Sequence, residues 1–252
     1  YGFIGLGQMG GPMAGNIVTK GFPLIVYDKA GTQELAPEGA TLASNAGDVA
    51  LATDTIFLSV PDGSISLSVI DEIIACEDRR AKVIVDLSTI GPEAAREANA
   101  RCLGAGITYI DAPVSGGQAG ARAGTVTVML AGPKDIVDAH SDVLLGFSKN
   151  PFHVGEDPGQ GQALKILNNF LSGTAMVATS EAILYGLSQG LEFKTMLDVV
   201  NVSTGQNTAT ADKFPNRIMT KTFDAGFATA LITKDINLFL DNANEAGTPT
   251  KI

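Results

Sequence analysis

Residues 1–10 of this chain are Tyr-Gly-Phe-Ile-Gly-Leu-Gly-Gln-Met-Gly, and residues 24–28 are Leu-Ile-Val-Tyr-Asp. An apolar run, a GxGxxG turn, a helical pattern and a second apolar run that ends in an acid follow one another there. This order predicts a βαβ unit with the fingerprint of dinucleotide binding. Its glycines let the backbone approach a pyrophosphate at the positive N-terminus of the helix. The turn that we expect to hold the cofactor is Gly5, Leu6, Gly7, Gln8, Met9 and Gly10.

Asp28 is the acidic residue of this pattern. Its carboxylate is placed to accept hydrogen bonds from the adenosine ribose hydroxyls, and it would repel a 2′-phosphate. The sequence therefore favours NAD, although Lys29 beside it keeps NADP as the alternative. A glycine-rich loop that binds nothing is the competing interpretation of the turn, and the complete βαβ pattern around it argues against that interpretation.

The first 157 residues alternate short apolar runs with helical patterns. Alternation of this kind predicts an α/β fold with a Rossmann-type, mostly parallel sheet that carries helices on both faces. Ligands of such a sheet gather at the carboxyl ends of its strands. The expected strands after Asp28 are 55–60, 83–87, 107–110, 126–130 and 151–154, and the expected helices are 33–37, 46–52, 65–76, 93–103 and 134–145.

Strand patterns nearly vanish after the turn-forming residues 156–159. A long helix is expected over residues 162–190, and its apolar residues lie on more than one face, so it needs cover on several sides. We therefore predict a dinucleotide-binding domain at 1–157 and an all-helical substrate and oligomerisation domain at 158–252, within a homodimer or homotetramer. The further helices expected there are 193–201, 212–220 and 229–246.

Composition limits the classes of function. The 252 residues include 45% hydrophobic residues and 29 glycines, which is typical of a globular α/β enzyme. A net charge of −10 argues against nucleic acid and anionic membranes as partners. We find no signal peptide and no run of about 20 uncharged apolar residues. Cys76 and Cys102 form no CxxC pair, which favours a reducing cytoplasm, although two thiols also suffice for one bridge. His140 and His153 are the sole histidines, so no metal site is expected.

Lys165 is the one charged residue in the helix-forming segment Gly159–Asn169. Burial of an ammonium disfavours its charged form and loosens its proton. Asn169 follows four residues later and shares the same helix face. A lysine beside an amide in this way suits proton transfer. The competing interpretation is a lysine at the edge of a core helix that extends its ammonium to water.

Two loops and one dipeptide are further candidates. Ser115, Gly116 and Gly117 follow a strand, and consecutive glycines leave backbone N–H groups free to bind a carboxylate, or simply form a turn with positive φ angles. Thr89 is placed to bind the nicotinamide end of the cofactor or to cap the helix that begins near Pro92. Lys234, next to Asp235, is a second cation at the cleft or half of a solvated ion pair.

Together these motifs resemble the β-hydroxyacid dehydrogenases, the family of 3-hydroxyisobutyrate dehydrogenase and 2-hydroxy-3-oxopropionate reductase. The resemblance covers essentially the whole chain and rests on five motifs in the same order, namely Gly2–Gly10, Asp86–Thr89, Asp111–Gly117, Gly159–Asn169 and Lys234-Asp235. It implies that Lys165 is the catalytic acid/base and that Asn169 orients the reacting oxygen. It also implies that Ser115, Gly116 and Gly117 bind the substrate carboxylate, and that the Gly5–Gly10 turn, Val60, Pro61, Thr89 and Lys234 contact the cofactor. Members of the family continue for a few helices, so the second domain is expected to be incomplete at Ile252.

Three other functions compete with a dehydrogenase of 3-hydroxyisobutyrate or a similar β-hydroxyacid. The first is the reverse reaction on tartronate semialdehyde (2-hydroxy-3-oxopropionate) or a related acid, and sequence does not decide the direction. An imine reductase of the same fold is the second, and Lys165 argues against it, because that group generally lacks this lysine. The third is a non-catalytic nucleotide-binding module, which has no need of Lys165, Asn169 and the Ser115 loop together.

Overall fold

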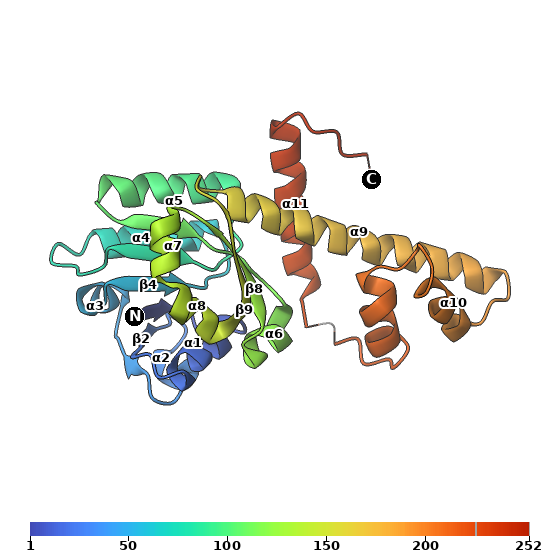
Figure 1. Ribbon diagram of the computed structural model, residues 1–252, viewed down its shortest axis with the longest axis horizontal. Coiled ribbons are helices and arrows are strands. Elements are labelled where there is room, and N and C mark those ends of the chain that lie inside the picture. The colour runs from blue at the N-terminus through green and yellow to red at the C-terminus, as the bar shows by residue number, and fades with distance from the viewer. Residues whose placement is uncertain (225, 252) are drawn as a thin grey trace. The chain divides into compact units, whose positions relative to one another are not determined.

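The computed structural model describes residues 1–224 and 226–251. It divides into two compact units, Tyr1–Lys165 and Ile166–Ile252. The first unit alternates strands and helices around one sheet, and the second is helical (Figure 1). The predicted fold class, a Rossmann-type mostly parallel sheet followed by a helical part, is confirmed.

The sheet of the first unit has the strand order β3-β2-β1-β4-β5-β6-β8-β7, with β9 paired to β8. Strands β6 and β7 run antiparallel to β8, and the other pairings in the described residues are parallel. The strands are β1 Gly2–Ile4, β2 Ile25–Tyr27, β3 Thr41–Leu42, β4 Thr55–Leu58, β5 Val83–Asp86, β6 Thr108–Asp111, β7 Val114–Ser115, β8 Val126–Ala131 and β9 Ser148–Gly155.

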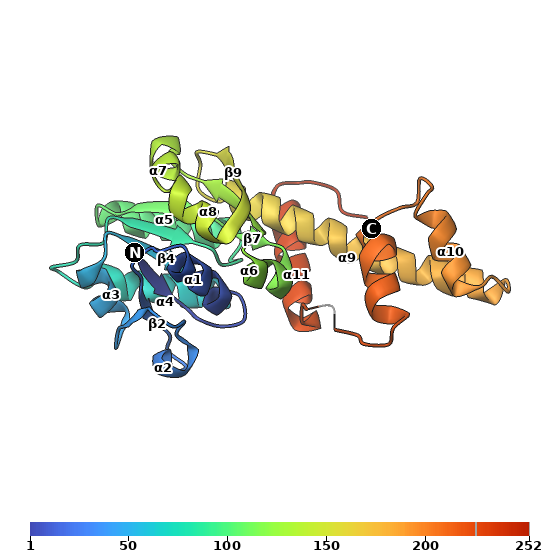
Figure 2. The same ribbon diagram turned by 60° about the horizontal axis from the view of Figure 1, so that its bottom comes forward.

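Helices cover both faces of this sheet (Figure 2). Side chains alternate along each strand, so Phe3 and Phe57 pack on one face while Ile4 and Ile56 pack on the other. The first face is covered by α1 Gly10–Thr19, α6 Gly117–Ala123, α7 Lys134–Ala139 and α8 Ser141–Phe147. The second is covered by α3 Ala46–Ala52, α4 Gly63–Ile74 and α5 Pro92–Gly104, and the short α2 spans Thr32–Leu35.

Two expectations for this unit were wrong in detail. The single helix expected over 134–145 is interrupted at His140, between α7 and α8. The imidazole of His140 explains the break, because its Nε2 bonds the hydroxyl of Thr55 at 2.8 Å and its Nδ1 bonds the carbonyl of Ile136 at 2.7 Å. The region after Asp111, expected as a loop, contains β7 and α6, because Val114 and Ser115 pair with β8.

The second unit is built around α9 Gln160–Ser188, whose first residues belong to the first unit. It continues with α10 Phe193–Val200, a π-helical segment Ala209–Ile218 and α11 Thr229–Glu245. The segment expected as an ordinary helix over 212–220 is π-helical, and Pro215 lies inside it. Proline has no N–H to donate, so it disfavours regular α-helical bonding there. Ile183, Leu197 and Phe214 form the small core of this unit.

Helix α9 has the length and composition of a membrane-crossing helix, contrary to the expectation from its sequence. Its most apolar 18-residue window has a mean hydropathy of 1.2, and 22% of that window is buried in the chain. One such helix is weak evidence, because core helices of globular proteins meet the same criterion. Leu171, Val177 and Leu184 are among the apolar side chains of α9 that the rest of the chain leaves exposed.

Candidate active site

The glycine turn lies between β1 and α1 and needs glycine at both ends. Gly5 has a φ of +94°, and a Cβ there would overlap the carbonyl oxygen of Ser59. A Cβ on Gly10 would overlap the carbonyl oxygen of Gly5. At Gly7, by contrast, an added Cβ would meet no atom within 4 Å. The turn is therefore packed on one side and open on the other, as the close approach of a pyrophosphate to backbone requires.

Asp28 fixes this turn from the end of β2. Its Oδ2 accepts a hydrogen bond from Leu6 N at 2.5 Å, and its Oδ1 accepts one from Ala30 N at 2.7 Å. A carboxylate has about four acceptor positions, so capacity remains for ribose hydroxyls. The acid is thus held where the sequence predicts contact with the ribose, and it also shapes the turn.

Two predicted cofactor segments lie side by side after β4 and β5. Val60 N donates to the hydroxyl of Ser88 at 2.9 Å, which connects Val60-Pro61 to Ser88-Thr89. Helix α5 begins at Pro92 with Gly91 in the N-cap position and without a side-chain cap. Thr89 is therefore not the cap of that helix, which excludes one of its two interpretations.

A buried carboxylate at the end of β6 holds the start of α9. Asp111 Oδ2 accepts hydrogen bonds from Gly159 N at 2.8 Å, Gly161 N at 3.1 Å and Gln162 N at 3.3 Å. These donors are unpaired groups of the helix N-terminus, where a negative charge is favourable. Burial nevertheless raises the pKa of Asp111 to about 7, against the opposing effect of these N–H donors. Lys165, one turn further along α9, is buried with 8% of its surface exposed.

A second buried acid, Asp86, lies beside Asp111 in the sheet register. Asp86 accepts hydrogen bonds from the hydroxyl of Ser66, from Ser88 N at 2.9 Å and from the hydroxyl of Tyr109 at 3.2 Å. Burial raises the pKa of Asp86, and it raises that of Tyr109 as well. All these partners are internal, so Asp86 serves to connect α4, β5 and β6.

The predicted carboxylate loop lies between β7 and α6. Gly116 has a φ of +136° and Gly117 a φ of +61°, so both adopt conformations that favour glycine. Helix α6 begins at Gly117 without a side-chain cap, so N–H groups of its first turn point out of the helix. Asn16 Nδ2 donates to the carbonyl of Ala121 at 2.7 Å and fixes α6 against α1, the helix of the glycine turn.

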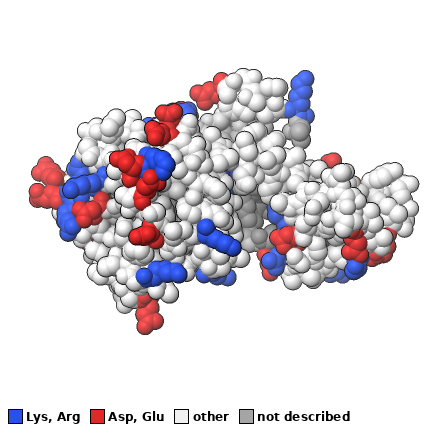
Figure 3. All heavy atoms as spheres, in the orientation of Figure 1, with Lys and Arg blue, Asp and Glu red and all other residues white. Residues whose placement is uncertain are grey.

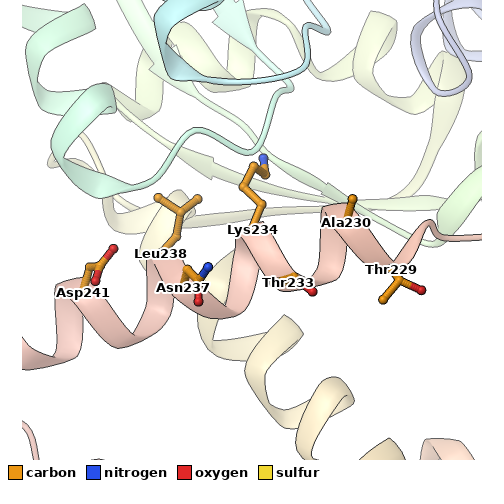
Figure 4. Close-up of a pocket in the computed structure, with 7 residues that line it drawn as sticks. All are labelled: Thr229, Ala230, Thr233, Lys234, Asn237, Leu238 and Asp241. Carbon is orange, nitrogen blue, oxygen red and sulfur yellow. The ribbon is translucent and has the colours of Figure 1, made fainter.

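The second unit contributes a separate polar group. Asn169 Nδ2 donates to Asp235 Oδ2 at 2.6 Å, and Lys234 Nζ lies 3.3 Å from Asp235 Oδ1. The Asp235 side chain is only 3% exposed, so this is not the solvated ion pair that was one interpretation of Lys234-Asp235. Lys234 also lines a hollow of about 550 Å³ along α11 (Figure 4). The residues that line it are Thr229, Ala230, Thr233, Lys234, Asn237, Leu238 and Asp241.

Apart from Ser115, Gly116 and Gly117, between β7 and α6, the sequence-predicted residues thus fall into two groups. The first unit brings together the glycine turn, Val60-Pro61, Ser88-Thr89 and the first turn of α9 at the carboxyl ends of its parallel strands. The second unit joins Asn169, Asp235 and Lys234.

Sequence reasoning missed the roles of two residues, Asp111 and Gln162. Both were quoted within motifs, but neither was assigned a task. Two signals in the sequence could have revealed these roles. Asp111 is an acid at the end of a buried strand, and Gln162 is a polar residue at the start of an apolar helix. Buried polar groups of this kind need hydrogen-bond partners.

Charges of both signs are mixed on the face of the molecule that Figure 3 shows. Figure 3 shows Lys and Arg interspersed with Asp and Glu over one face of the described residues. With a net charge of −10, this arrangement does not favour a polyanionic partner.

Comparison with known proteins accounts for both units. Residues 1–155 match the family described as the NAD binding domain of 6-phosphogluconate dehydrogenase. Residues 159–252 match the family described as NAD-binding of NADP-dependent 3-hydroxyisobutyrate dehydrogenase. A solved structure of 3-hydroxyisobutyrate dehydrogenase from Mycobacterium tuberculosis with L-serine has a TM-score of 0.91 at 29% identity, covering 99% of this chain and 88% of that one.

Two sequence relatives extend along almost the entire chain. The chain is 37% identical to 2-(hydroxymethyl)glutarate dehydrogenase from Eubacterium barkeri, over 98% of this chain and 83% of that protein. It is 34% identical to mitochondrial 3-hydroxyisobutyrate dehydrogenase from Rattus norvegicus, over 98% of this chain and 77% of that protein. The chain therefore belongs to the β-hydroxyacid dehydrogenase family, the NAD(P)-dependent oxidoreductases that act on a CH–OH group.

Proposed function

We propose that this enzyme interconverts a short β-hydroxyacid and its semialdehyde, with Lys165 as general acid/base. The observation that carries the proposal is the burial of Lys165 in the second turn of α9, a helix whose start Asp111 anchors at the carboxyl edge of the sheet. A lysine held there is positioned to exchange a proton with a substrate at this edge of the sheet. The helix start that holds it is joined to the same sheet edge as the glycine turn.

The remaining roles follow the two groups of residues. We assign Asn169, which Asp235 holds by a hydrogen bond, to orienting the reacting oxygen. The substrate carboxylate would bind to Ser115, Gly116 and Gly117, at the start of α6. Contacts with the cofactor are assigned to Gly5, Leu6, Gly7, Gln8, Met9, Gly10, Asp28, Val60, Pro61, Thr89 and Lys234.

The chemistry needs a proton acceptor at the alcohol oxygen. When bound, NAD(P) supplies the site that accepts or returns a hydride. Lys165 takes the hydroxyl proton during oxidation and returns it during reduction, and its charge stabilises developing alkoxide. A carboxylate held at the start of α6 fixes which carbon faces the cofactor, because positioning supplies several kcal/mol of catalysis. The same residues serve the semialdehyde-reducing direction, including tartronate semialdehyde.

The compounds named for the relatives define the proposed substrate class. 3-Hydroxyisobutyrate, 2-(hydroxymethyl)glutarate and L-serine each carry a hydroxymethyl group on the carbon next to a carboxylate, and they differ in the third substituent on that carbon. We propose that this enzyme acts on the same HO–CH2–CH(R)–COO⁻ unit. A screen of such acids that differ only in R, with each cofactor, tests it. If the enzyme turns over none of these acids in either direction, the proposal is rejected.

The first prediction concerns the cofactor. The charge of Asp28, held by Leu6 and Ala30, should repel a 2′-phosphate by roughly 1–3 kcal/mol. We expect NAD to bind at least about tenfold more tightly than NADP. Asp28→Asn keeps an acceptor for Leu6 N while removing the charge, and it should narrow the difference. Titration of both cofactors measures this, and tighter binding of NADP to the wild type would contradict it and implicate Lys29.

The second prediction concerns assembly. Leu171, Val177 and Leu184 on α9 are 60%, 61% and 66% exposed. At about 100° per residue, Leu171 lies on a different side of the helix from the other two. We propose that a second copy covers these residues in a homodimer or homotetramer. Sedimentation at micromolar concentration should show at least a dimer, which Val177→Glu with Leu184→Glu should weaken and Ser68→Glu, at an exposed serine of α4, should not. A monomeric wild type would contradict the prediction.

We further propose that residue 157 marks the boundary between two domains with different functions. Residues 1–157 would hold the cofactor, and 158–252 would supply Lys165, Asn169, the subunit interface and one further cofactor contact, Lys234. Cys76 and Cys102 are both free thiols, in keeping with the predicted cytoplasmic location, which stays a prediction.

A further inference from the structure

The side-chain amide of Gln162 is completely buried and uses all of its hydrogen-bonding capacity. Its Oε1 accepts from Ile90 N at 2.9 Å and from Gly91 N at 3.2 Å. Its Nε2 donates to the carbonyl of Ser88 at 3.0 Å and to Asp111 Oδ1 at 3.2 Å. One amide therefore contacts the residues on both sides of Thr89, together with the carboxylate that anchors α9.

The four bonds of Gln162 lie close in the chain to both Thr89 and Lys165. Thr89 lies between Ser88 and Ile90, both of which the amide holds, so the amide fixes the path of Thr89 from either side. Lys165 follows Gln162 by three residues, less than one helical turn. The Gln162 side chain therefore bonds to both the Ser88–Gly91 segment and the carboxylate that caps α9.

We propose that Gln162 is a positioning residue, which joins the segment that carries Thr89 to the helix turn that carries Lys165. The inference rests on the proposed function, in which Thr89 contacts the cofactor and Lys165 moves the proton. Hydride and proton must leave one CH–OH group in a single geometry, and a misplacement of about 1 Å costs on the order of 100-fold in rate. A rigid amide between the two segments meets that requirement.

Two substitutions of Gln162 distinguish a positioning role from a contribution to folding. Gln162→Met keeps a long unbranched side chain and removes all four bonds. Gln162→Glu keeps an acceptor for Ile90 N and Gly91 N, but it turns an oxygen toward Asp111 Oδ1 and the carbonyl of Ser88. The matched control is Gln160→Met, because Gln160 is exposed in the same helix turn and its side chain bonds to Asp157 instead of the Ser88–Gly91 segment.

The carboxyl group that Gln162→Glu introduces should make kcat depend on pH differently from that of the wild type. The titratable groups around this position are Asp111 on β6, Asp86 on β5 with Tyr109 beside it, and Lys165 on α9 itself. Two facing carboxylates repel, whereas a protonated carboxyl donates to an oxygen in place of Nε2. The ratio of kcat for Gln162→Glu to that of the wild type should therefore rise as the pH falls from 8 to 6. Loss of stability alone would not produce this ratio in a variant that is folded throughout.

The experiment compares hydrogen exchange with kinetics in the full chain. For Gln162→Met we expect faster amide exchange in peptides covering both 88–91 and 159–165, and a fall in kcat of roughly 10- to 100-fold. Gln160→Met should change neither. Faster exchange with kcat within twofold of the wild type would overturn the proposal, as would a flat pH ratio for Gln162→Glu. Failure of the wild type to turn over any β-hydroxyacid would instead reject the proposed function, because the exchange result is independent of turnover.

Discussion

Lys165→Ala should lower kcat by about 10²- to 10⁴-fold, the usual contribution of a positioned acid/base. The variant removes the group that exchanges the proton and leaves the glycine turn and Asp28 in place. Lys165→Arg should be nearly as damaging, because a guanidinium stays protonated and cannot accept the proton. Asn169→Ala should cost less, since the amide orients the oxygen without exchanging a proton. Steady-state kinetics on an acid that the wild type oxidises measures all three effects.

Two controls make this result specific. Lys149→Ala removes an exposed lysine of the first unit and should leave kcat unchanged. Cofactor affinity of Lys165→Ala should stay within about threefold of the wild-type value, because Lys165 is assigned to the substrate. Wild-type turnover by Lys165→Ala would make this residue a structural lysine and would reject the mechanism.

The free energy of unfolding should fall by about 2–3 kcal/mol between pH 5 and pH 8 through Asp111 alone. Burial raises the pKa of its carboxyl to about 7, above the ordinary value of 3.8. Between these two values the folded state holds a proton that the unfolded state has released. The resulting stability is complete below the unfolded pKa and is lost as the pH rises through the folded pKa. Chemical denaturation at a series of pH values measures the slope.

Asp111→Asn is the reference for this measurement. The substitution removes the titration of Asp111 and keeps Asp86, whose pKa burial also raises. The difference between the wild-type and Asp111→Asn stabilities therefore isolates the effect of Asp111, and this difference should decrease with rising pH. A constant or increasing difference would mean that the N–H donors of Gly159, Gly161 and Gln162 keep the carboxylate ionised despite its burial.

Local sequence signals accounted for most of the first unit. The glycine turn, α3 at Ala46–Ala52 and the alternation of buried strands follow from short-range periodicity and turn chemistry, which a sequence displays directly. Asp28 was also placed correctly at the end of β2, because an acid after an apolar run has few other positions in a βαβ unit.

Contacts distant in sequence were beyond this reasoning. The break at His140 depends on Thr55, 85 residues away, and the role of Gln162 depends on Ser88, 74 residues away. Neither partner can be read from periodicity. Thr89 was likewise left with two interpretations, because only the structure shows that Gly91 takes the N-cap position of α5.

Helix α9 continues without interruption from Gln160 to Ser188, which limits how the length of this chain can change in evolution. One inserted residue turns the rest of a helix by about 100° and advances it by about 1.5 Å. An insertion between Lys165 and Asn169 would therefore leave a good helix and yet send Asn169 to a different side from Lys165, and an insertion between Gln162 and Lys165 would do the same to Lys165 relative to Gln162. An insertion in the turn at residues 189–192, between α9 and α10, would not change which side chains of α9 share a face. Insertions and deletions among descendants of this sequence should accordingly accumulate in that turn, while residues 162–169 vary only by substitution.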